Sequence, residues 1–199
     1  NLLNDNGNFR VAHSEIEFPN SIREKLEDQT IDKIFIIGQG TAAVAGQALG
    51  QYLSEETEIT VESIPSTELS GFKLSTDMSN VLVVAISQSG TTTDTNRTVD
   101  LVRGRGAAVI AIVNRRNSDL SQKADGVIYT SDGRDIEMSV ASTKAFYSQI
   151  AASFLLGISI HDQVLSEPNN SVNQEYRQAL LYELNELPKK MIAVLQQQN

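Results

Sequence analysis

The sequence contains no cysteine and only two histidines among its 199 residues. The absence of cysteine excludes disulfides, zinc–thiolate sites and a thiol nucleophile, and it fits a cytosolic protein. The two histidines, His13 and His161, lie far apart along the chain, and neither has a metal-ligating partner at helical spacing. We therefore expect both to be ordinary surface or packing residues, and we expect no metal and no cofactor.

Long apolar runs are also missing. No segment approaches the length of about 20 apolar residues that crosses a bilayer, and Asn1–Arg10 is too polar for a signal peptide. These absences predict a soluble, cytoplasmic protein with no membrane partner. Because the chain begins at Asn1 without an initiator methionine, we expect a processed protein or an excised piece.

Positive charge is scarce. The chain has 16 Lys and Arg residues against 25 Asp and Glu residues, which gives a formal net charge of −9 and a pI near 4.7. Most of such a surface repels the phosphates of nucleic acids, so we expect no nucleic-acid partner. A phosphate bound by this protein would have to be small and held by a local group of residues.

What the sequence does contain is an alternation of buried strands and helices. Apolar runs predict five strands, at 34–37, 58–64, 81–86, 107–113 and 127–129. Helical patterns fall at 21–26, 41–53, 94–104, 118–123 and 140–160, and a short helix or turn begins at Pro65. This alternation is typical of βαβ units, so the sequence predicts an α/β fold with a parallel, doubly wound sheet and one sizeable core.

Hydroxyl side chains gather where the third predicted strand ends. The apolar run Val81–Ile86 leads directly into residues 87–93, which read Ser-Gln-Ser-Gly-Thr-Thr-Thr. Ligands of open α/β sheets bind at the carboxyl ends of strands, Gly90 lets the backbone approach a ligand, and the helix that follows attracts a phosphate to its N-terminus. The alternative is that these residues only cap the helix starting near Asp94. Five hydroxyls in seven positions exceed the need of one cap, which favours phosphate binding.

A glycine-containing loop also follows the first strand. Gly38–Ala43 matches the G-x-G-x-x-A pattern of dinucleotide-binding folds, which also require an acidic residue at the end of the second strand. Glu62 lies near the required distance, but Ser63 and Ile64 continue the strand beyond it. Because the hydroxyl-rich loop would have no role in a dinucleotide site, this alternative is less favoured.

The sequence lacks both the nucleophile motif of serine hydrolases and the phosphate-binding motif of P-loop proteins. Ser89 lacks the first glycine of the G-x-S-x-G elbow of serine hydrolases, and only His161 follows it as a base. No G-K-[ST] sequence occurs, which excludes a Walker phosphate loop.

A third polar segment, Val140–Phe146, opens the long apolar helix. Ser142 and Thr143 could cap this helix, and Lys144 would be a cation close to the carboxyl edge of the sheet. A lysine early in a helix opposes the helix dipole. A packing or ligand role for Lys144 and a solvated side chain therefore both remain open.

Taken together, three segments resemble the sugar isomerase (SIS) domain family in order and spacing: Gly40-Thr41, Ser87–Thr92 and Val140–Phe146. The resemblance is strongest to the first of two such domains in isomerising glutamine–fructose-6-phosphate aminotransferases. It implies a three-layer, flavodoxin-like α/β fold, in which helices flank a five-stranded parallel sheet and a sugar-phosphate site lies at the strand ends. Glu15–Ile22 and Leu184–Pro188 resemble the segments that enter and leave such a domain.

The resemblance also implies which residues bind the sugar phosphate, of the fructose 6-phosphate or glucosamine 6-phosphate class. The implied substrate-binding residues are Thr41, Ser87, Gln88, Ser89, Thr92, Val140 and Ser142, with Gly40, Gly90 and Lys144 as auxiliary residues. Two departures from the family pattern, Ala42-Ala43 and Thr91, leave the identity of the sugar open.

Catalytic residues are not expected in this chain. In the family, the acid/base residues of isomerisation and a sugar-binding lysine come from a second SIS domain and the tail after it, and glutamine hydrolysis uses a cysteine of another domain. The resemblance therefore implies that the chain alone binds sugar phosphate weakly without turning it over. SIS domains also serve as regulatory sugar-phosphate sensors, and this alternative remains open at the level of sequence.

The expected organisation has three parts. Residues 1–13 form a flexible lead-in, 14–165 form the SIS domain, and 166–199 form a helix or linker toward a second domain absent from this chain. The resemblance further implies a homodimer.

Overall fold

The computed structural model describes residues 1–132, 143–164 and 171–197. The chain divides into two compact units, one formed by His13–Val164 and the other by Asn1–Ala12 with Leu165–Asn199. Each unit is described separately below. Whether the residues after 165 lead toward a further domain stays a prediction.

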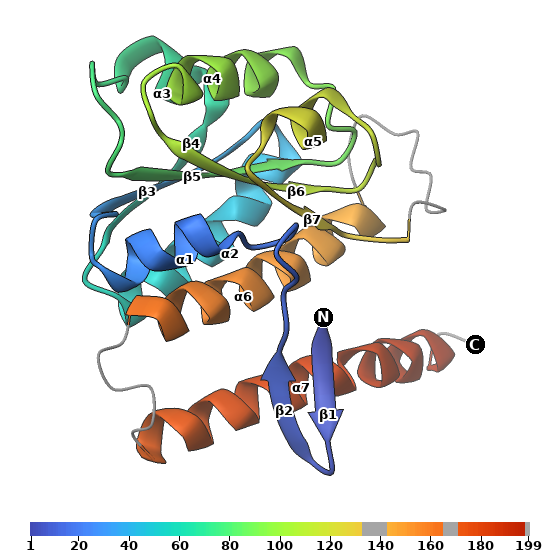
Figure 1. Ribbon diagram of the computed structural model, residues 1–199. Helices are drawn as coiled ribbons and strands as arrows, with labels where there is room; N and C mark the ends of the chain where they lie inside the picture. Colours follow the sequence, from blue (N-terminus) through green and yellow to red (C-terminus); the bar gives the residue numbers. More distant parts are fainter. Residues whose placement is uncertain (133–142, 165–170, 198–199) are drawn as a thin grey trace. The chain divides into compact units, whose positions relative to one another are not determined.

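The larger unit is built on a five-stranded parallel sheet (Figure 1). Its strand order is β4-β3-β5-β6-β7, and the strands are β3 (Lys33–Gly38), β4 (Thr60–Pro65), β5 (Val81–Ser87), β6 (Ala108–Val113) and β7 (Gly126–Tyr129). All five strands expected from the sequence are present, with ends that differ by a few residues. The α/β, doubly wound fold is confirmed.

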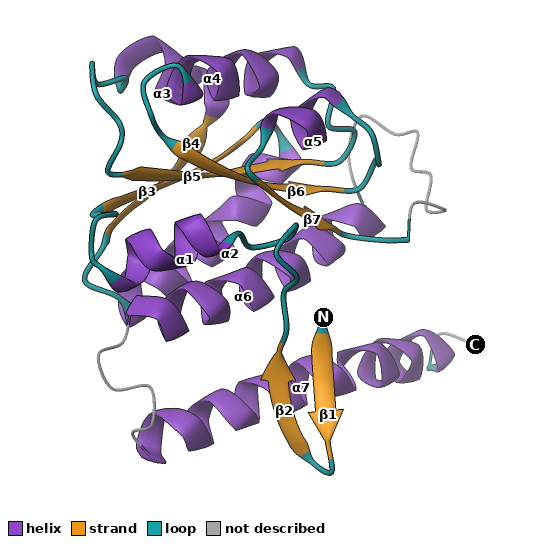
Figure 2. Cartoon of the chain, in the orientation of Figure 1, coloured by secondary structure: helices purple, strands orange, loops and turns teal. Residues whose placement is uncertain are grey.

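Helices cover both faces of this sheet (Figures 1 and 2). One face carries α1 (Asn20–Glu27), α2 (Thr41–Glu56) and α6 (Lys144–Val164), and the other carries α3 (Ser66–Phe72), α4 (Thr93–Arg103) and α5 (Asp119–Lys123). Every residue of β5 and of β6 is buried. This double cover is the reason that these strands read as continuous apolar runs without alternation.

The sheet separates two hydrophobic cores, because successive strand residues point to opposite faces. Ile34 and Ile36 belong to the core beneath α1, α2 and α6, whereas Phe35 and Ile37 belong to the core beneath α3 and α4. Burial of these two apolar layers is the main stabilising contribution to the fold.

Small residues allow α2 to pack closely on the sheet and on α6, as its alanine-rich sequence predicts. A Cβ atom on Gly46 would lie 2.8 Å from Cγ2 of Ile36. A Cβ atom on Gly157 of α6 would lie 2.9 Å from side-chain atoms of both Leu49 and Tyr52. The helices therefore fix each other's position through contacts that any larger side chain would break.

These contacts also show that α2 and α6 run in the same direction. Gly157 lies at the level of Leu49 and Tyr52, and His161, one turn further along α6, lies 4.0 Å from the carboxylate of Glu56. Counted back from these contacts at an equal rise per residue, the N-termini of the two helices lie at the same level. This level is the edge of the sheet where the parallel strands end. The predicted start of α6 at Val140 lies outside the described residues.

The smaller unit contains a hairpin of β1 (Leu2–Asp5) and β2 (Asn8–Val11). This differs from the irregular, flexible lead-in expected for residues 1–13. The turn is formed by Asn6 and Gly7, whose φ angles of 56° and 91° fit a two-residue hairpin turn. Asn-Gly is a strong hairpin signal, but each strand has only four residues and Leu2–Asp5 does not alternate.

The hairpin packs on α7 (Ser171–Gln196) within the same unit. The side-chain amide of Gln178 accepts a hydrogen bond from the Phe9 amide and donates one to the Phe9 carbonyl, both at 2.7 Å. The rings of Phe9 and Tyr182 meet edge to face at 6.1 Å. Gln178 thus occupies the place that a neighbouring strand would take at this point.

Helix α7 continues through Pro188, although proline commonly interrupts a helix. Proline removes the hydrogen bond that position 188 would donate to the carbonyl of Leu184, but the other turns remain helical. A membrane-crossing helix, long and apolar enough to span a bilayer, is not found among the described residues.

Candidate functional site

The candidate site lies where the strand order of the sheet reverses direction. The chain leaves β3 to form α2 on one face, and it leaves β5 to form α4 on the other face, although β3 and β5 are neighbours (Figure 1). Two loops that diverge in this way leave a crevice outside the carboxyl ends of the strands, which is where open α/β sheets bind ligands. The two loops are residues 38–41 and 87–92.

The loop after β3 brings the first turn of α2 against the sheet. A Cβ atom on Gly38 would lie 2.8 Å from the backbone nitrogen of Ala43 and 3.1 Å from the Ile86 carbonyl, so only glycine permits this approach. Gly40, with φ 58° and ψ −129°, turns the chain into the helix, and a Cβ atom there would meet open space. Thr41 is the first residue of α2 and is partly exposed.

The loop after β5 is organised by hydroxyl groups. The Ser87 hydroxyl accepts a hydrogen bond from the Gly90 amide at 3.0 Å and lies 3.4 Å from the Thr92 hydroxyl. Ser87 is only 3% exposed. Its hydroxyl therefore shapes the loop from within, and the ligand contact expected for Ser87 stays a prediction.

The outer side of the same loop carries partly exposed groups. The Ser89 hydroxyl accepts hydrogen bonds from the amide and the hydroxyl of Thr91, at 3.2 Å and 3.1 Å. Ser89, Gln88 and Thr92 are half-buried and Thr91 is exposed, so these side chains border solvent. Thr92 ends the loop as the N-cap position of α4, whose free amides and positive dipole end favour an anion.

Three residues not predicted from the sequence, Asn96, Ser118 and Leu120, contact this loop from α4 and from the start of α5. The buried Asn96 side chain donates to the carbonyls of Gly90 and Thr92, at 3.1 Å and 3.0 Å. The Gly90 carbonyl also accepts the amide of Leu120, at 3.0 Å. A Cβ atom on Gly90, whose φ is +65°, would lie 2.1 Å from the hydroxyl oxygen of buried Ser118. The spacing from Thr92 to Asn96, one helical turn, is the sequence signal that points to Asn96.

The N-terminus of α6 lies level with that of α2, as the contacts at Gly157 and His161 indicate. Lys144 is the first residue of α6 and is exposed. Of the predicted ligand-binding residues, Val140 and Ser142 lie outside the described residues. The structure therefore brings together Gly40, Thr41 and the loop 87–92 and leaves the third predicted segment untested.

A dinucleotide site is not supported, because Glu62 has other partners. Its carboxylate lies 2.7 Å from Nζ of Lys33 and 2.6 Å from Nζ of Lys73, and hydrogen bonds from these two ammonium groups lower the pKa of Glu62. The strand also continues past Glu62 to Pro65. This carboxylate is thus part of an ion-pair network at the edge of the sheet.

The two histidines take packing roles, as expected. The ring of His13 meets that of Phe18 edge to face at 6.2 Å, and burial lowers the pKa of His13. His161 contacts Tyr52 at 6.4 Å between ring centres. Within the described ranges, no group of three His, Asp or Glu side chains is arranged to hold a metal.

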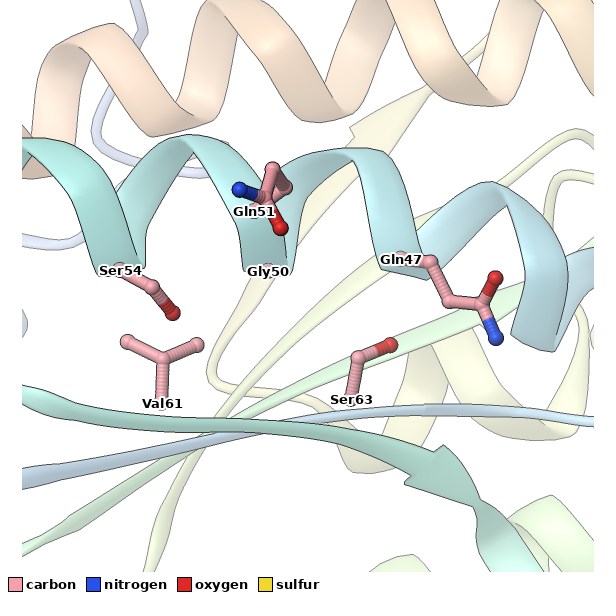
Figure 3. Close-up of a pocket in the computed structure, with 6 residues that line it drawn as sticks. All are labelled: Gln47, Gly50, Gln51, Ser54, Val61 and Ser63. Carbon is pink, nitrogen blue, oxygen red and sulfur yellow. The ribbon is translucent and has the colours of Figure 1, made fainter.

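A separate cavity of about 230 Å³ lies between α2 and β4 (Figure 3). It is lined by Gln47, Gly50, Gln51, Ser54, Val61 and Ser63. Gly50 follows Thr41, the first residue of α2, by nine positions, which corresponds to about 14 Å along the helix axis. The cavity therefore lies away from the strand ends and contains none of the predicted ligand-binding residues.

Known proteins match the chain in sequence. The sequence profile of the SIS domain family matches residues 29–159. Glutamine–fructose-6-phosphate aminotransferase (isomerising) of Corynebacterium diphtheriae is 38% identical over 169 residues, which cover 84% of this chain and 25% of that protein. The protein of the same name from Mycolicibacterium smegmatis is 36% identical over 173 residues, covering 85% and 27%. The chain thus spans about a quarter of the length of these curated relatives.

Solved structures share the fold. The C-terminal domain of glucosamine-fructose-6-phosphate aminotransferase from Francisella tularensis superimposes with a TM-score of 0.69 at 23% identity, covering 86% of this chain and 47% of that one. Glucosamine-6-phosphate deaminase from Thermotoga maritima gives a TM-score of 0.59 at 18% identity, covering 81% and 50%. The sheet order and the profile match agree, and the chain belongs to the SIS domain family.

Proposed function

We propose that this chain is the sugar-phosphate-binding domain of an isomerising glutamine–fructose-6-phosphate aminotransferase. The observation that carries the proposal is the loop 87–92, which places Ser89, Thr91 and Thr92 at the strand-order reversal and at the N-terminus of α4. Neutral hydroxyls, backbone amides and a helix dipole suit a small phosphate in a protein whose net charge is −9. The named relatives are enzymes, which favours this function over a regulatory sensor.

The roles divide between the two loops. Ser89, Thr92 and Gln88 hold the phosphate and neighbouring hydroxyls, with Gly90 supplying the turn and Ser87 supporting it from within. Thr41, after Gly40, lines the sugar chain. Val140, Ser142 and Lys144 complete the proposed site from the segment that opens α6.

In the whole enzyme, ammonia from glutamine would be added at C2 of the ketose phosphate, and proton transfer would convert the ketose into the aldose form. The acid and base of this step are proposed to lie outside the present 199 residues, which span a quarter of the relatives. We accordingly expect this chain to bind fructose 6-phosphate or glucosamine 6-phosphate without turnover, and to act in the cytoplasm.

Titration with these two sugar phosphates tests the proposal. We expect saturable binding at millimolar ligand by calorimetry or by NMR shifts of the 87–92 amides. Ser89→Ala should weaken binding about tenfold, because one hydrogen bond to a charged group is worth about 1.5 kcal/mol. Its effect on the free energy of unfolding should stay below about 0.5 kcal/mol, since Ser89 is half-buried.

Ser75→Ala is the matched control, because Ser75 is exposed in the loop after α3. It should leave both affinity and stability unchanged. The proposal fails if the unmodified chain shows no saturable shift, or if Ser89→Ala and Ser75→Ala bind equally well.

A further inference from the structure

Gln149 is a buried polar residue that the proposed site does not yet use. Its side chain is 1% exposed, and neither its carboxamide nitrogen nor its oxygen has a hydrogen-bond partner among the described residues. Burying an unpaired carboxamide is unfavourable, and nearly all such groups in folded proteins are paired. The burial of Gln149 therefore requires a reason.

The position of Gln149 follows from the register between α2 and α6. Gly157 of α6 lies against Leu49 and Tyr52 of α2, with contacts of 2.9 Å to a Cβ built on the glycine. Because the helices run in the same direction, two turns back from Gly157 lead to Gln149 on α6 and to the first turn of α2, at Ala42. Gln149 thus lies at the level of the helix turn that starts with Thr41.

The side of α6 that carries Gln149 faces the sheet. Gln149 falls on one helical stripe with Ala152 and Leu156, and both of these belong to the hydrophobic core between the sheet and the helices α1, α2 and α6. Ala42 and Ala145 are also buried near this level. The helix register and the shared stripe place Gln149 on the sheet side of α6, at the level where α2 starts after the loop 38–41.

We infer that Gln149 is a positioning residue of the sugar-phosphate site, with its carboxamide hydrogen-bonded through ordered water to the sugar bound above the first turn of α2. This rests on the proposed function. Bound sugar and its ordered water supply the hydrogen-bond partners that Gln149 lacks in the described part of the chain. The cost of burying an unpaired carboxamide is then removed on binding, and this gain increases the affinity for the sugar. Gln149 then destabilises the free chain and stabilises the complex with the sugar phosphate.

Gln149→Met tests this, since methionine keeps the volume and the unbranched shape but removes both polar atoms. We expect the variant to melt higher than the unmodified chain by about 3 °C, because an unpaired buried group is removed. We expect its dissociation constants for fructose 6-phosphate and glucosamine 6-phosphate to rise about tenfold. A purely structural residue would not move these two quantities in opposite directions.

Ser153→Ala is the matched control. Ser153 lies one turn further along α6, is fully buried, and its hydroxyl likewise lacks a partner in the described part of the chain. It is about 6 Å farther from the carboxyl edge along the helix axis. This variant should also melt higher, and its affinity for both sugar phosphates should be unchanged.

Side-chain amide signals give a direct readout. The ¹⁵N-edited NH₂ signals of Gln149, identified by their loss in Gln149→Met, should shift when fructose 6-phosphate is added to the unmodified chain. The inference is overturned if Gln149→Met binds as tightly as the unmodified chain, or if it melts lower, which would reveal a structural partner for the carboxamide. If the unmodified chain itself does not bind, the proposed function fails first and the inference with it.

Discussion

At the scale of single residues, Gly90 is a position that should tolerate no other side chain. Its φ of +65° is unfavourable for any other residue, and a Cβ atom would lie 2.1 Å from Oγ and 2.5 Å from Cβ of Ser118. We expect Gly90→Ala to lower the free energy of unfolding by about 3 kcal/mol, from backbone strain and overpacking together. It should also weaken sugar-phosphate binding, because the loop must move away from Ser118. Urea denaturation and ligand titration measure the two effects.

Gly71→Ala provides the comparison for Gly90. Gly71 lies in α3, and a Cβ atom there would meet nothing within 4 Å. Alanine should stabilise this helix by about 0.5–1 kcal/mol. Equal stability losses in the two variants would contradict the role assigned to Gly90.

The sequence predicts those site residues that directly follow a strand, and it misses those that contact the loop from other elements. Ser89, Thr92 and Gly90 stand out because hydroxyls and a glycine directly follow an apolar strand. Ser118 contacts the loop from the start of α5, and such a contact arises only when separate segments fold together. Asn96 lies one helical turn after Thr92, but this spacing alone does not show that its side chain turns back to the loop carbonyls. For the same reason the sequence does not reveal that the Ser87 hydroxyl points inward.

At the scale of elements, the ion-pair network of Glu62 ties the edge strand β4 to its neighbours. The hydrogen bond from Lys33 of β3, and then that from Lys73 after α3, lower the pKa of Glu62 below its usual value near 4.5. A carboxylate whose folded-state pKa is lowered stabilises the fold above its unfolded pKa, and this contribution is lost as the pH falls through the folded-state value.

Glu62→Gln should therefore lower the free energy of unfolding at pH 7 by about 0.5–1 kcal/mol, a modest value because the pair is partly exposed to solvent. The difference from the unmodified chain should disappear at a pH below the folded-state pKa. Urea denaturation across pH 2.5–7 measures it, with Glu58→Gln at an exposed position as the control. A difference that persists in acid would show that the charge of Glu62 is not its cause.

Elements of the larger unit were predictable because their signals are strong and local. β5 and β6 are continuous apolar runs, and α2 has small residues on its packing face. The hairpin at Leu2–Val11 was not predicted, since its strands are only four residues long and half of their residues are polar. The hairpin depends on Gln178 and Tyr182, nearly 170 residues away, for its packing.

At the scale of the whole molecule, the exposed residues of α7 bear on the proposed dimer. Leu187, Met191, Val194 and Leu195 are 42–63% exposed and recur at helical spacing. Apolar groups that cluster on a surface are typical of contacts between proteins. A second copy of this chain is the partner implied by the resemblance to SIS domains.

Light scattering tests this proposal directly. We expect a mass of about twice 21.7 kDa at high protein concentration, and we expect Met191→Glu combined with Leu195→Glu to shift the protein to the monomer. Glu175→Gln, at an exposed position near the start of α7, should leave the mass unchanged. A monomer at all concentrations would contradict the proposal.

The neighbouring positions of β3 and β5 also bear on how the protein folds. These strands pair along their length, yet residues 39–80 separate them in the chain. Loop closure must precede this pairing, which makes it a slow, non-local step of folding. The ligand-binding crevice cannot exist before the pair has formed, so a bound sugar phosphate should slow unfolding and leave the early refolding rate unaffected. Ligand binding during refolding would then report the moment at which the centre of the sheet assembles.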